Sequence, residues 1–496
     1  MKKIFISILL ILALVLTGCQ NLQACKHADI DNNGLCDDCQ ASVVVTFDFY
    51  TINDLHGKFA DSNDNVGVDE MTSYFRNARL ADENVILLSA GDMWQGSAES
   101  NSTRGQLIVD WMNDLDFTAM SMGNHEFDWG EEYIKSNAEM AEFPFLAINI
   151  YDRETNAQVD YCSSSVLVDA DGMQIGIIGA IGDCYSSIAS DHTQGIYFKT
   201  GAELTELVKA ESTMLKEKGA DFIVYVLHDG YEYSKGDSVT TVDGSKLKSY
   251  YDISLSDGYV DLVFEGHTHQ KYMLRDEYGV LHLQHGGDND GISHIEITLN
   301  SANGNKAVYQ KELVSADYYG AYRDDPIVEQ LLEKYSDVLS KVTENLGTAK
   351  RKMTGQQMCD IIARLYYETG VEKWGDEYEI ALGGGFMSIR SPYDIQPGNV
   401  TYGMLQTIFP FDNELVLCSI KGSDLKDRFI NTTNTRYYIY ENEAITSNID
   451  PNGTYYVIVD SYSSTYKSNR LTEIERYGEA YYGRDMLAEY FKNGGL

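Results

Sequence analysis

Short apolar runs alternate with amphipathic stretches between residue 43 and about residue 320. This alternation predicts a layered α/β core in which strands and helices follow one another along the chain. One amphipathic stretch, Gly201 to Lys218, carries its apolar residues at helical spacing and therefore predicts a helix. The runs that have the size and composition of buried strands are 43–52, 84–90, 117–122, 173–180, 221–227 and 260–264.

A second, smaller α+β unit is predicted from Leu346 to Leu496. Between the two units, Asp325 to Val342 predicts a charged amphipathic linker helix, and Pro326 suits its first turn. The fold class expected for the whole chain is therefore α/β, with a second domain joined by a helical linker. The elements expected in the second unit are helices at 354–367 and 422–431, a glycine turn at 383–385, and strands at 413–420 and 454–460.

The length and charge of the chain indicate how many domains to expect and which binding partners are excluded. A chain of 496 residues is too long for one hydrophobic core, in agreement with two units. Its formal net charge is −38, from 76 acidic and 38 basic side chains. Nucleic-acid tracks and patches for anionic membranes need clustered Lys and Arg, so neither a nucleic-acid polymer nor a charged membrane surface is an expected partner. The acidic balance suits a solvated extracellular enzyme.

The N-terminus has the features of a targeting segment. Met1 to Lys3 is positively charged, Ile4 to Leu16 is apolar, and Leu16-Thr17-Gly18-Cys19 closes the segment. The apolar run is short for a membrane span. Its end resembles a bacterial lipobox, which implies that Cys19 becomes the lipidated first residue of an extracytoplasmic lipoprotein held at the cell membrane. An ordinary signal peptide that happens to end in Cys is the alternative.

Residues 20–42 form a short polar segment in which two metal motifs overlap. The run Asp29-Ile-Asp31-Asn-Asn33-Gly34 matches the start of a calcium loop, but Gln40 stands where a bidentate Glu is required. A disordered tether with a disulfide is the alternative, because an oxidising exterior permits one. A possible Cys₃His zinc set consists of Cys25, His27, Cys36 and Cys39. The cysteines expected to be buried thiols, or to form one disulfide, are Cys162, Cys184, Cys359 and Cys418.

Five of the strand-like runs end at a turn that contains Asp, Asn or His. Loops beyond the carboxyl ends of strands converge over an open α/β sheet, so these turns are expected to form one pocket. Mixed imidazole, amide and carboxylate ligands suit two divalent cations, and Zn, Mn, Co and Fe all remain open. Asp92 is the best candidate for a shared carboxylate, because it follows a strand directly and Gly91 lets an ion approach closely. The turns are 53–57, 91–92, 123–128, 228–230 and 266–269.

These turns resemble the signature of the calcineurin-like metallophosphoesterases. With Phe127-Asp128, the three glycines at 383–385 and Pro410-Phe411-x-Asn413, the chain resembles the 5′-nucleotidase family, which also contains UDP-sugar hydrolases and cyclic-nucleotide phosphodiesterases. The resemblance implies a layered α/β-β sandwich as the first domain. It also implies that His125, oriented by Asp128, stabilises the transition state or protonates the leaving oxygen. The implied ligands are Asp54, His56, Asp92 and His269 for one metal, and Asp92, Asn124, His228 and His267 for the other.

The resemblance is weaker in the residues that would bind substrate. It implies that two aromatic rings enclose the nucleobase, with Phe411 as the first ring and Tyr462 or Tyr466 as the second. The family motif Asn-Gly-Gly-Gly-Ile-Arg here reads Leu382-Gly-Gly-Gly-Phe386-Met387, so its Arg is missing and Arg390 lies three positions further on. Core packing is the alternative role for Phe411, and a surface position is the alternative for Arg390. Asp229 is an alternative ligand to His228.

The sequence therefore predicts a secreted, lipid-anchored enzyme that hydrolyses nucleoside 5′-monophosphates with two metal ions. Cyclic nucleotides and UDP-sugars are alternative substrates, and a surface protein that binds nucleotides or metals without turnover is the alternative from another class. The expected organisation is a signal peptide at 1–18, a tether at 19–42, the metallophosphoesterase domain at 43–320, the linker helix at 321–345 and the substrate-binding domain at 346–496.

Overall fold

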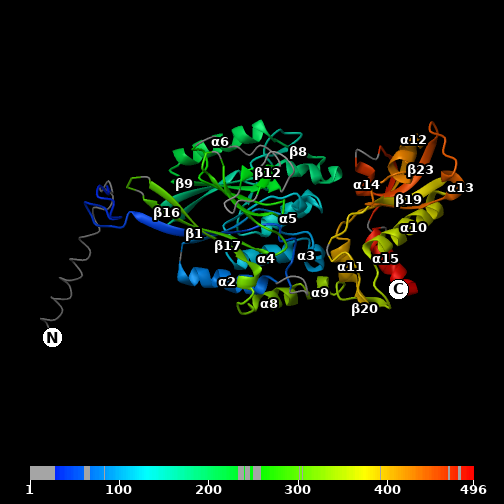
Figure 1. Ribbon diagram of the computed structural model, residues 1–496, viewed down its shortest axis with the longest axis horizontal. Coiled ribbons are helices and arrows are strands. Elements are labelled where there is room, and N and C mark those ends of the chain that lie inside the picture. Colours follow the sequence, from blue (N-terminus) through cyan, green and yellow to red (C-terminus); the bar gives the residue numbers. More distant parts are fainter. Residues whose placement is uncertain are drawn as a thin grey trace.

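The chain folds into two bodies that lie side by side (Figure 1). The larger, N-terminal body carries the strands labelled β1, β9 and β16, and the smaller, C-terminal body carries β19, β23 and α10. The computed structural model describes residues 28–60, 67–82, 84–232, 239–240, 246–249, 258–276, 278–300, 302–303, 305–390, 392–466, 470–478 and 482–496.

The first sheet of the N-terminal body has six strands in the order β17-β16-β1-β2-β3-β4. Strands β1 to β4 are parallel, whereas β16 pairs antiparallel with both β1 and β17. All six residues from Phe47 to Ile52 of β1 are buried, as expected for a strand covered on both faces. The strands are β1 (Val44–Ile52), β2 (Val85–Ser89), β3 (Ala119–Ser121), β4 (Phe145–Leu146), β16 (Gly291–Asn300) and β17 (Asn305–Ser315).

The second sheet also has six strands, in the order β14-β15-β13-β9-β7-β6. The four central strands are parallel, and β14 and β6 close the sheet with antiparallel edges. The strands are β6 (Ser165–Ala170), β7 (Met173–Ile181), β9 (Phe222–His228), β13 (Leu262–Glu265), β14 (Lys271–Arg275) and β15 (Leu281–His285).

The two sheets pack face to face, and helices cover both outer faces. Between the sheets, the rings of Phe47, Phe49 and Phe222 lie 5.5 to 6.4 Å apart. Leu204, Val208 and Leu215 of α6 pack on the outside of the second sheet. The predicted layered α/β-β sandwich is therefore confirmed. The covering helices are α2 (Val68–Ala81), α4 (Gln106–Asp114) and α5 (Glu131–Met140) on the first sheet, and α6 (Ala202–Glu217) on the second.

The C-terminal body is one mixed sheet with helices on both faces. Its strands run in the order β22-β19-β23-β21-β24, with α10 (Gly355–Trp374) and α15 (Gly483–Tyr490) on one face. The short helices α12 (Gly422–Leu425) and α13 (Glu443–Thr446) lie against the other face. The strands are β19 (Ile380–Phe386), β21 (Leu415–Lys421), β22 (Tyr437–Glu441), β23 (Thr454–Asp460) and β24 (Thr472–Tyr477).

Two predicted elements differ in the structure. The three glycines at 383–385 lie inside strand β19 instead of forming a turn. Close packing explains the glycine at 383, because a Cβ there would lie 2.4 Å from the carbonyl oxygen of Ala363 in α10. The segment predicted as one linker helix holds two short helices, α8 (Ile327–Lys334) and α9 (Ser336–Leu339). Val328 and Leu331 of α8 pack into the core of the N-terminal body, so this helix is anchored to it.

The remaining short elements connect these layers. Strands β18 and β20 form a two-stranded antiparallel sheet beside the junction of the two bodies, and α11 follows β20 directly. In Figure 1, α11 lies between the two bodies. These elements are α3 (Ala98–Ser102), β5 (Ile150–Asp152), β8 (Ile196–Phe198), β10 (Tyr231–Glu232), β11 (Val239–Thr240), β12 (Lys246–Ser249), α7 (Ala316–Tyr319), β18 (Asn345–Ala349), β20 (Gly398–Thr401), α11 (Tyr402–Ile408) and α14 (Ser461–Thr465).

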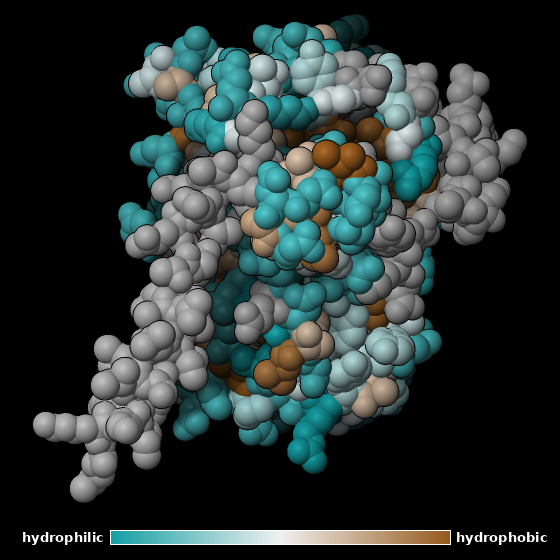
Figure 2. All heavy atoms as spheres, turned by 90° about the vertical axis from the view of Figure 1, so that its left-hand side faces the viewer, coloured by the Kyte–Doolittle hydropathy of each residue, from teal (hydrophilic) through white to brown (hydrophobic). Residues whose placement is uncertain are grey.

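The N-terminal segment is only partly described. Cys19, Cys25 and His27, on which the lipidation and zinc predictions depend, lie outside the described residues. Asp29 is buried and accepts hydrogen bonds from the backbone of Asn33 and Gly34. No helix in the described ranges is both long enough and apolar enough to cross a bilayer. On the face shown in Figure 2, hydrophobic residues form only small groups among hydrophilic ones.

Candidate metal centre and substrate cleft

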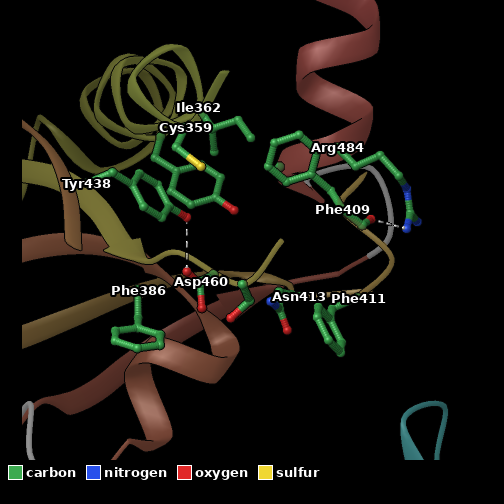
Figure 3. Close-up of a pocket in the computed structure, with 12 residues that line it drawn as sticks. Cys359, Ile362, Phe386, Phe409, Phe411, Asn413, Tyr438, Asp460 and Arg484 are labelled. Carbon is green, nitrogen blue, oxygen red and sulfur yellow. Dashed lines mark hydrogen bonds between the residues drawn. The ribbon is translucent and has the colours of Figure 1, made fainter. Parts of the chain in front are cut away.

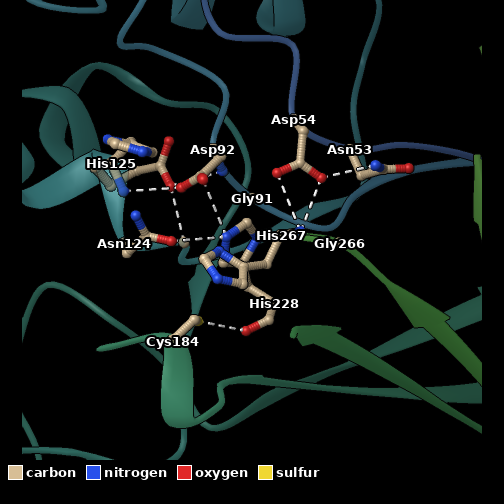
Figure 4. Close-up of polar contacts among 12 residues, drawn as sticks. Asn53, Asp54, Gly91, Asp92, Asn124, His125, Cys184, His228, Gly266 and His267 are labelled. Carbon is tan, nitrogen blue, oxygen red and sulfur yellow. Dashed lines mark hydrogen bonds and ion pairs between the residues drawn. The ribbon is translucent and has the colours of Figure 1, made fainter. Parts of the chain in front are cut away.

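The turns after five strands meet at one end of the sandwich (Figure 4). The turns after β1 and β2 are joined by a hydrogen bond from the Asp54 amide to the Gly91 carbonyl oxygen, 2.9 Å long. The two sheets are joined at this end by the His267 amide, which donates to both carboxylate oxygens of Asp54 at 3.0 and 2.9 Å. The carboxyl ends of strands from both sheets therefore open into one polar site, as predicted.

One group of candidate ligands consists of Asp54, His56 and His269, whose ligand atoms all lie within 4.8 Å of one another. His269 Nε2 lies 3.4 Å from Asp54 Oδ1 and 3.1 Å from His56 Nε2. His56 Nδ1 donates to the carbonyl oxygen of Gln95 at 2.9 Å, so the proton of neutral His56 is on Nδ1 and its Nε2 carries a lone pair. The buried imidazole of His56 and the partly exposed imidazole of His269 face each other through these nitrogens, an arrangement that suits a shared cation.

A second group surrounds Asp92 and His228. The Nε2 atom of His228 lies 3.1 Å from Asp92 Oδ2 and 3.3 Å from the amide oxygen of Asn124. Its Nδ1 donates to the Ala90 carbonyl oxygen at 2.6 Å, which orients the ring and leaves Nε2 toward the site. Asp54 also belongs to a group with Asp92 and His228, and the His267 ring lies 5.5 Å from that of His228. All seven predicted metal ligands therefore lie in one continuous cluster.

The backbone of this cluster is strained in a way that fits ion binding. Asp54, His56, Asp92, His267 and His269 all have positive φ angles, between 48° and 67°. A residue with a Cβ loses about 1–3 kcal/mol in such a conformation, which persists at sites where the surroundings impose it. Five strained residues converge on one point, and each presents a carboxylate or an imidazole. The donors and the backbone together fit a pair of divalent cations.

Burial and charge perturb the ionisable groups of the cluster. Burial alone would raise the pKa of the Asp92 carboxyl, but the neighbouring His228 lowers this pKa well below its usual value. The pKa of His228 is raised to about 10, because the attraction of Asp92 outweighs burial. Burial lowers the pKa of His267 to about 4, which keeps this imidazole neutral and able to coordinate at neutral pH.

Glu126 holds the turns after β2 and β3 together, a role that the sequence did not reveal. Its buried carboxylate accepts hydrogen bonds from the backbone amides of Asp92, Met93 and Gly123, at 2.9, 2.8 and 2.7 Å. Burial, and then the charge of Asp92, raise the pKa of Glu126 to about 7. Glu126 therefore positions Asp92 through the backbone of the turn that carries it.

Replacing Glu126 by alanine should lower the free energy of unfolding by about 3 to 5 kcal/mol, because three buried amides lose their acceptor. Chemical denaturation of the metal-free protein would measure the change. Glu126→Gln keeps one oxygen acceptor and should lose less. Equal stability of the alanine variant and the parent protein would contradict this role.

His125 and Asp128 form the predicted dyad beside the cluster. His125 Nδ1 donates to Asp128 Oδ2 at 2.7 Å, and the His125 amide donates to Asp92 Oδ1 at 2.8 Å. Arg390 of the C-terminal body reaches across the junction, with Nη2 2.7 Å from His125 Nε2 and 3.2 Å from Gln95 Oε1. Arg390 is therefore not a surface arginine, and its guanidinium lies beside the dyad.

A cavity of about 490 Å³ extends from the dyad between the two bodies. All four predicted substrate-binding residues, Phe411, Arg390, Tyr462 and Tyr466, line it together with His125. The Phe411 ring lies 6.2 Å from the His125 ring, at the end near the metal cluster. In another part of the lining, Tyr466 stacks on Phe386, with the ring centres 5.9 Å apart. An aromatic face and a cation thus share one cleft with the dyad.

Two further lining residues, Phe386 and Arg436, were missed by the sequence reasoning. The Arg436 guanidinium lies 4.5 Å from the centre of the Phe386 ring and donates to the Met387 carbonyl oxygen at 3.4 Å. Arg436 therefore brings a cation close to Met387, where the family motif would carry an arginine. Phe386 could have been found from the sequence, because it replaces the Ile of the family's glycine motif. Arg436 has no such local signal, and it lies in the segment just before β22.

Asp229, the alternative ligand to His228, and three other side chains make different contacts. Asp229 accepts hydrogen bonds from the amides of Cys184 and Gly230 and is absent from the ligand groups among the described residues. Cys184 borders the site, with its thiol donating to the His228 carbonyl oxygen at 3.0 Å, and burial raises its pKa well above the usual value. His282 and His294 bind carboxylates elsewhere, Glu265 and Asp48 respectively.

Comparison with known proteins gives matches over both bodies. A sequence model of the calcineurin-like phosphoesterases matches residues 47–271, and one of the 5′-nucleotidase C-terminal domain matches residues 338–442. Protein UshA of Yersinia enterocolitica is 23% identical over 410 residues, covering 75% of this chain and 72% of the relative. The 5′-nucleotidase of Homo sapiens is 28% identical over 400 residues, covering 73% and 66%. The crystal structure of a 5′-nucleotidase precursor from Thermus thermophilus superposes with a TM-score of 0.66 at 20% identity, over 90% of this chain and 96% of that one.

Proposed function

Because the chain belongs to the 5′-nucleotidase family, a family of metal-dependent phosphoester hydrolases, we propose that it removes the phosphate from nucleoside 5′-monophosphates. The observation that carries this proposal is the position of His125. Its ring lies between the ligand cluster and the aromatic cleft, with Asp128 on one nitrogen and Arg390 on the other. A protein that only binds metals or nucleotides has no need of an oriented imidazole at this point.

In the proposed site, Asp54, His56, Asp92 and His269 would hold one divalent ion, and Asp92, Asn124, His228 and His267 the other. When bound, such ions ionise a water nucleophile and neutralise the charge that develops on the phosphoryl oxygens. Their identity is left open, since this mixture of ligands suits Zn, Mn, Co and Fe.

The residues of the chain itself would orient the ester and move a proton. Asp128 accepts the Nδ1 proton of His125, which directs Nε2 into the cleft. From there His125 would stabilise the transition state or protonate the leaving oxygen. Arg390, beside His125 Nε2, would turn its planar fork to the non-bridging oxygens of the bound phosphate. The aromatic rings would hold the base, because every base has a flat face for stacking.

Metal removal and a panel of substrates test this function. The purified protein, supplied with Mn²⁺, should release phosphate from AMP, and EDTA should abolish the release. Added Mn²⁺ or Zn²⁺ should then restore it. Faster turnover of 2′,3′-cyclic AMP or of UDP-glucose would replace the 5′-nucleotidase assignment with that activity. Tight nucleotide binding without turnover of any of the three would favour a binding protein.

Replacing Phe411 by alanine should raise KM for AMP by about 5- to 150-fold, the range expected for losing one ring stacked on a base. The ring lines the cleft near His125, so the change should leave hydrolysis of glycerol 2-phosphate, which has no base, close to that of the parent. Steady-state kinetics on both esters would measure the effect. If Phe411 serves only core packing, both esters should be affected alike.

We also propose that the chain is anchored outside the cytoplasm through a lipid on Cys19. The charged start, the apolar run and the sequence Leu16-Thr17-Gly18-Cys19 support this proposal. Cys19→Ser should leave the protein unlipidated, which mass spectrometry of the N-terminal peptide would detect. The domain boundaries 43–320 and 346–496 are proposed in the same way, and limited proteolysis between them would test these boundaries.

A further inference from the structure

Asp412 is a carboxylate held between two arginines that come from different bodies. Its Oδ1 lies 2.5 Å from Nη2 of Arg484 in the C-terminal body, and its Oδ2 lies 2.5 Å from Nη1 of Arg104 in the N-terminal body. Burial would raise the pKa of Asp412, but Arg484 and Arg104 lower it. Asp412 directly follows Phe411, so this charge cluster lies at the base of the ring that faces His125.

Arg484 fixes the loop that carries Phe411 (Figure 3). Its side chain is 5% exposed, and Nη1 donates to the carbonyl oxygens of Phe409 and Pro410 at 3.1 and 3.3 Å. Its Nε donates to the Tyr402 hydroxyl at 3.1 Å. All three guanidinium nitrogens therefore make polar contacts. Three of these contacts are with Phe409, Pro410 and Asp412 of the 409–412 loop.

Arg104 is held in place by the N-terminal body. Its guanidinium lies 5.5 Å from the centre of the Trp129 ring and 5.4 Å from that of Tyr133. Its backbone has a φ of 53°, in the left-handed region that few non-glycine residues adopt. Trp129 follows Asp128, the partner of His125, so the cluster touches the segment that orients the dyad.

We propose that Arg104, Asp412 and Arg484 are positioning residues that place Phe411 against His125 and so set the affinity for the nucleobase. This inference rests on the proposed nucleotide substrate. Arg484 shapes the loop, and Arg104 docks the loop on the catalytic body. Removing one arginine leaves the Asp412 carboxylate with only one of its two cationic partners, so the loop is expected to move.

The experiment compares two esters in matched variants. Arg484→Ala and Arg104→Ala should each raise KM for AMP by about 5- to 150-fold, the loss expected when stacking fails, and change KM for glycerol 2-phosphate less than about threefold. Arg484→Lys should restore part of the affinity. Arg79→Ala is the control, because Arg79 pairs with Asp116 within the N-terminal body and should change neither ester.

Combination with Phe411→Ala separates positioning from a general loss of structure. If the arginines act through Phe411, Arg104→Ala should add less than about twofold to KM for AMP in the Phe411→Ala background. The proposal would be overturned if the KM increases of Arg104→Ala and Phe411→Ala multiplied in the double variant. It would also be overturned if the arginine variants raised KM equally for AMP and glycerol 2-phosphate. Arg484→Ala removes several contacts of a buried side chain and could prevent folding. In that case the test uses Arg104→Ala alone.

A measurement without substrate distinguishes failure of this inference from failure of the proposed function. With 4-fluorophenylalanine at position 411, the ¹⁹F resonance should shift or broaden in Arg104→Ala and stay unchanged in Arg79→Ala. An unchanged resonance in both variants would refute the positioning role, whatever the enzyme hydrolyses. A shifted resonance in an enzyme that does not act on AMP would retain the positioning role and reject the nucleotide substrate.

Discussion

Replacing Asp92 by asparagine should lower kcat/KM for AMP by more than about 100-fold. Asp92 is fully buried between the two ligand groups, with Oδ2 3.1 Å from His228 and Oδ1 accepting the His125 amide. Loss of a residue that only hydrogen-bonds to a metal ligand lowers metal affinity or activity about 10- to 100-fold. Loss of Asp92, the proposed ligand of both ions, should therefore have a larger effect. Initial rates at saturating Mn²⁺, with metal content from elemental analysis, would measure the loss.

Asp116→Asn is the matched control for this change. Asp116 also has a positive φ, of 50°, but it lies on the surface and pairs with Arg79. The control should keep full activity and full metal content. An Asp92→Asn enzyme that retains two ions and turns over AMP within tenfold of the parent would show that Asp92 does not bridge the metals.

Replacing His125 by alanine should lower kcat for AMP by about 10²- to 10⁴-fold, the usual contribution of a positioned acid or base. The effect should fall mainly on kcat, because His125 is proposed to act on the transition state while the rings and Arg390 hold the ground state. Asp128→Asn should have a smaller effect in the same direction, since it disturbs the orientation of the imidazole and leaves the ring in place. Steady-state kinetics on AMP would measure both variants.

The choice of leaving group identifies the role of His125. Nitrophenolate leaves without protonation, so an enzyme that has lost its acid should hydrolyse nitrophenyl phosphate with much less loss than AMP. An equal loss on both esters would favour electrostatic stabilisation of the phosphoryl group over proton transfer. Unchanged kcat for AMP would remove His125 from the catalytic machinery.

The ligand cluster could be predicted because strand ends have a local signal. Each candidate ligand is the last residue of a strand or lies within four residues after it, and parallel strands end at the same edge of a sheet. The run at 84–90 became β2, from Val85 to Ser89, and Asp92 follows it by three residues. The burial of β9 and β13 was likewise visible in their composition. The position of these candidate ligands is therefore determined mainly by where the strands end along the chain, and less by side-chain packing.

The cleft between the bodies could be predicted only in part, because its residues meet through packing. Arg390 reaches His125 from 265 positions away along the chain. Glu126 lies in the ligand motif, but its three amide partners are defined only when the turns after β2 and β3 are close together. The glycines at 383–385 show the same limit, because their lack of a side chain is explained by neighbours that only the fold brings close: helix α10 at Gly383, strand β22 at Gly384 and Asp460 at Gly385.

The two arginines that line the cleft, Arg390 and Arg436, have a consequence for the encounter with substrate. The chain carries twice as many acidic as basic side chains, so most of its surface repels a phosphate ester at long range. Arg390 and Arg436 line the cleft itself, so their charges oppose this repulsion close to the site and attract an anion inward. The association rate of the substrate should therefore fall in dilute salt, where the repulsion from the acidic surface reaches further. Added salt should raise this rate until it also screens the attraction of the two arginines.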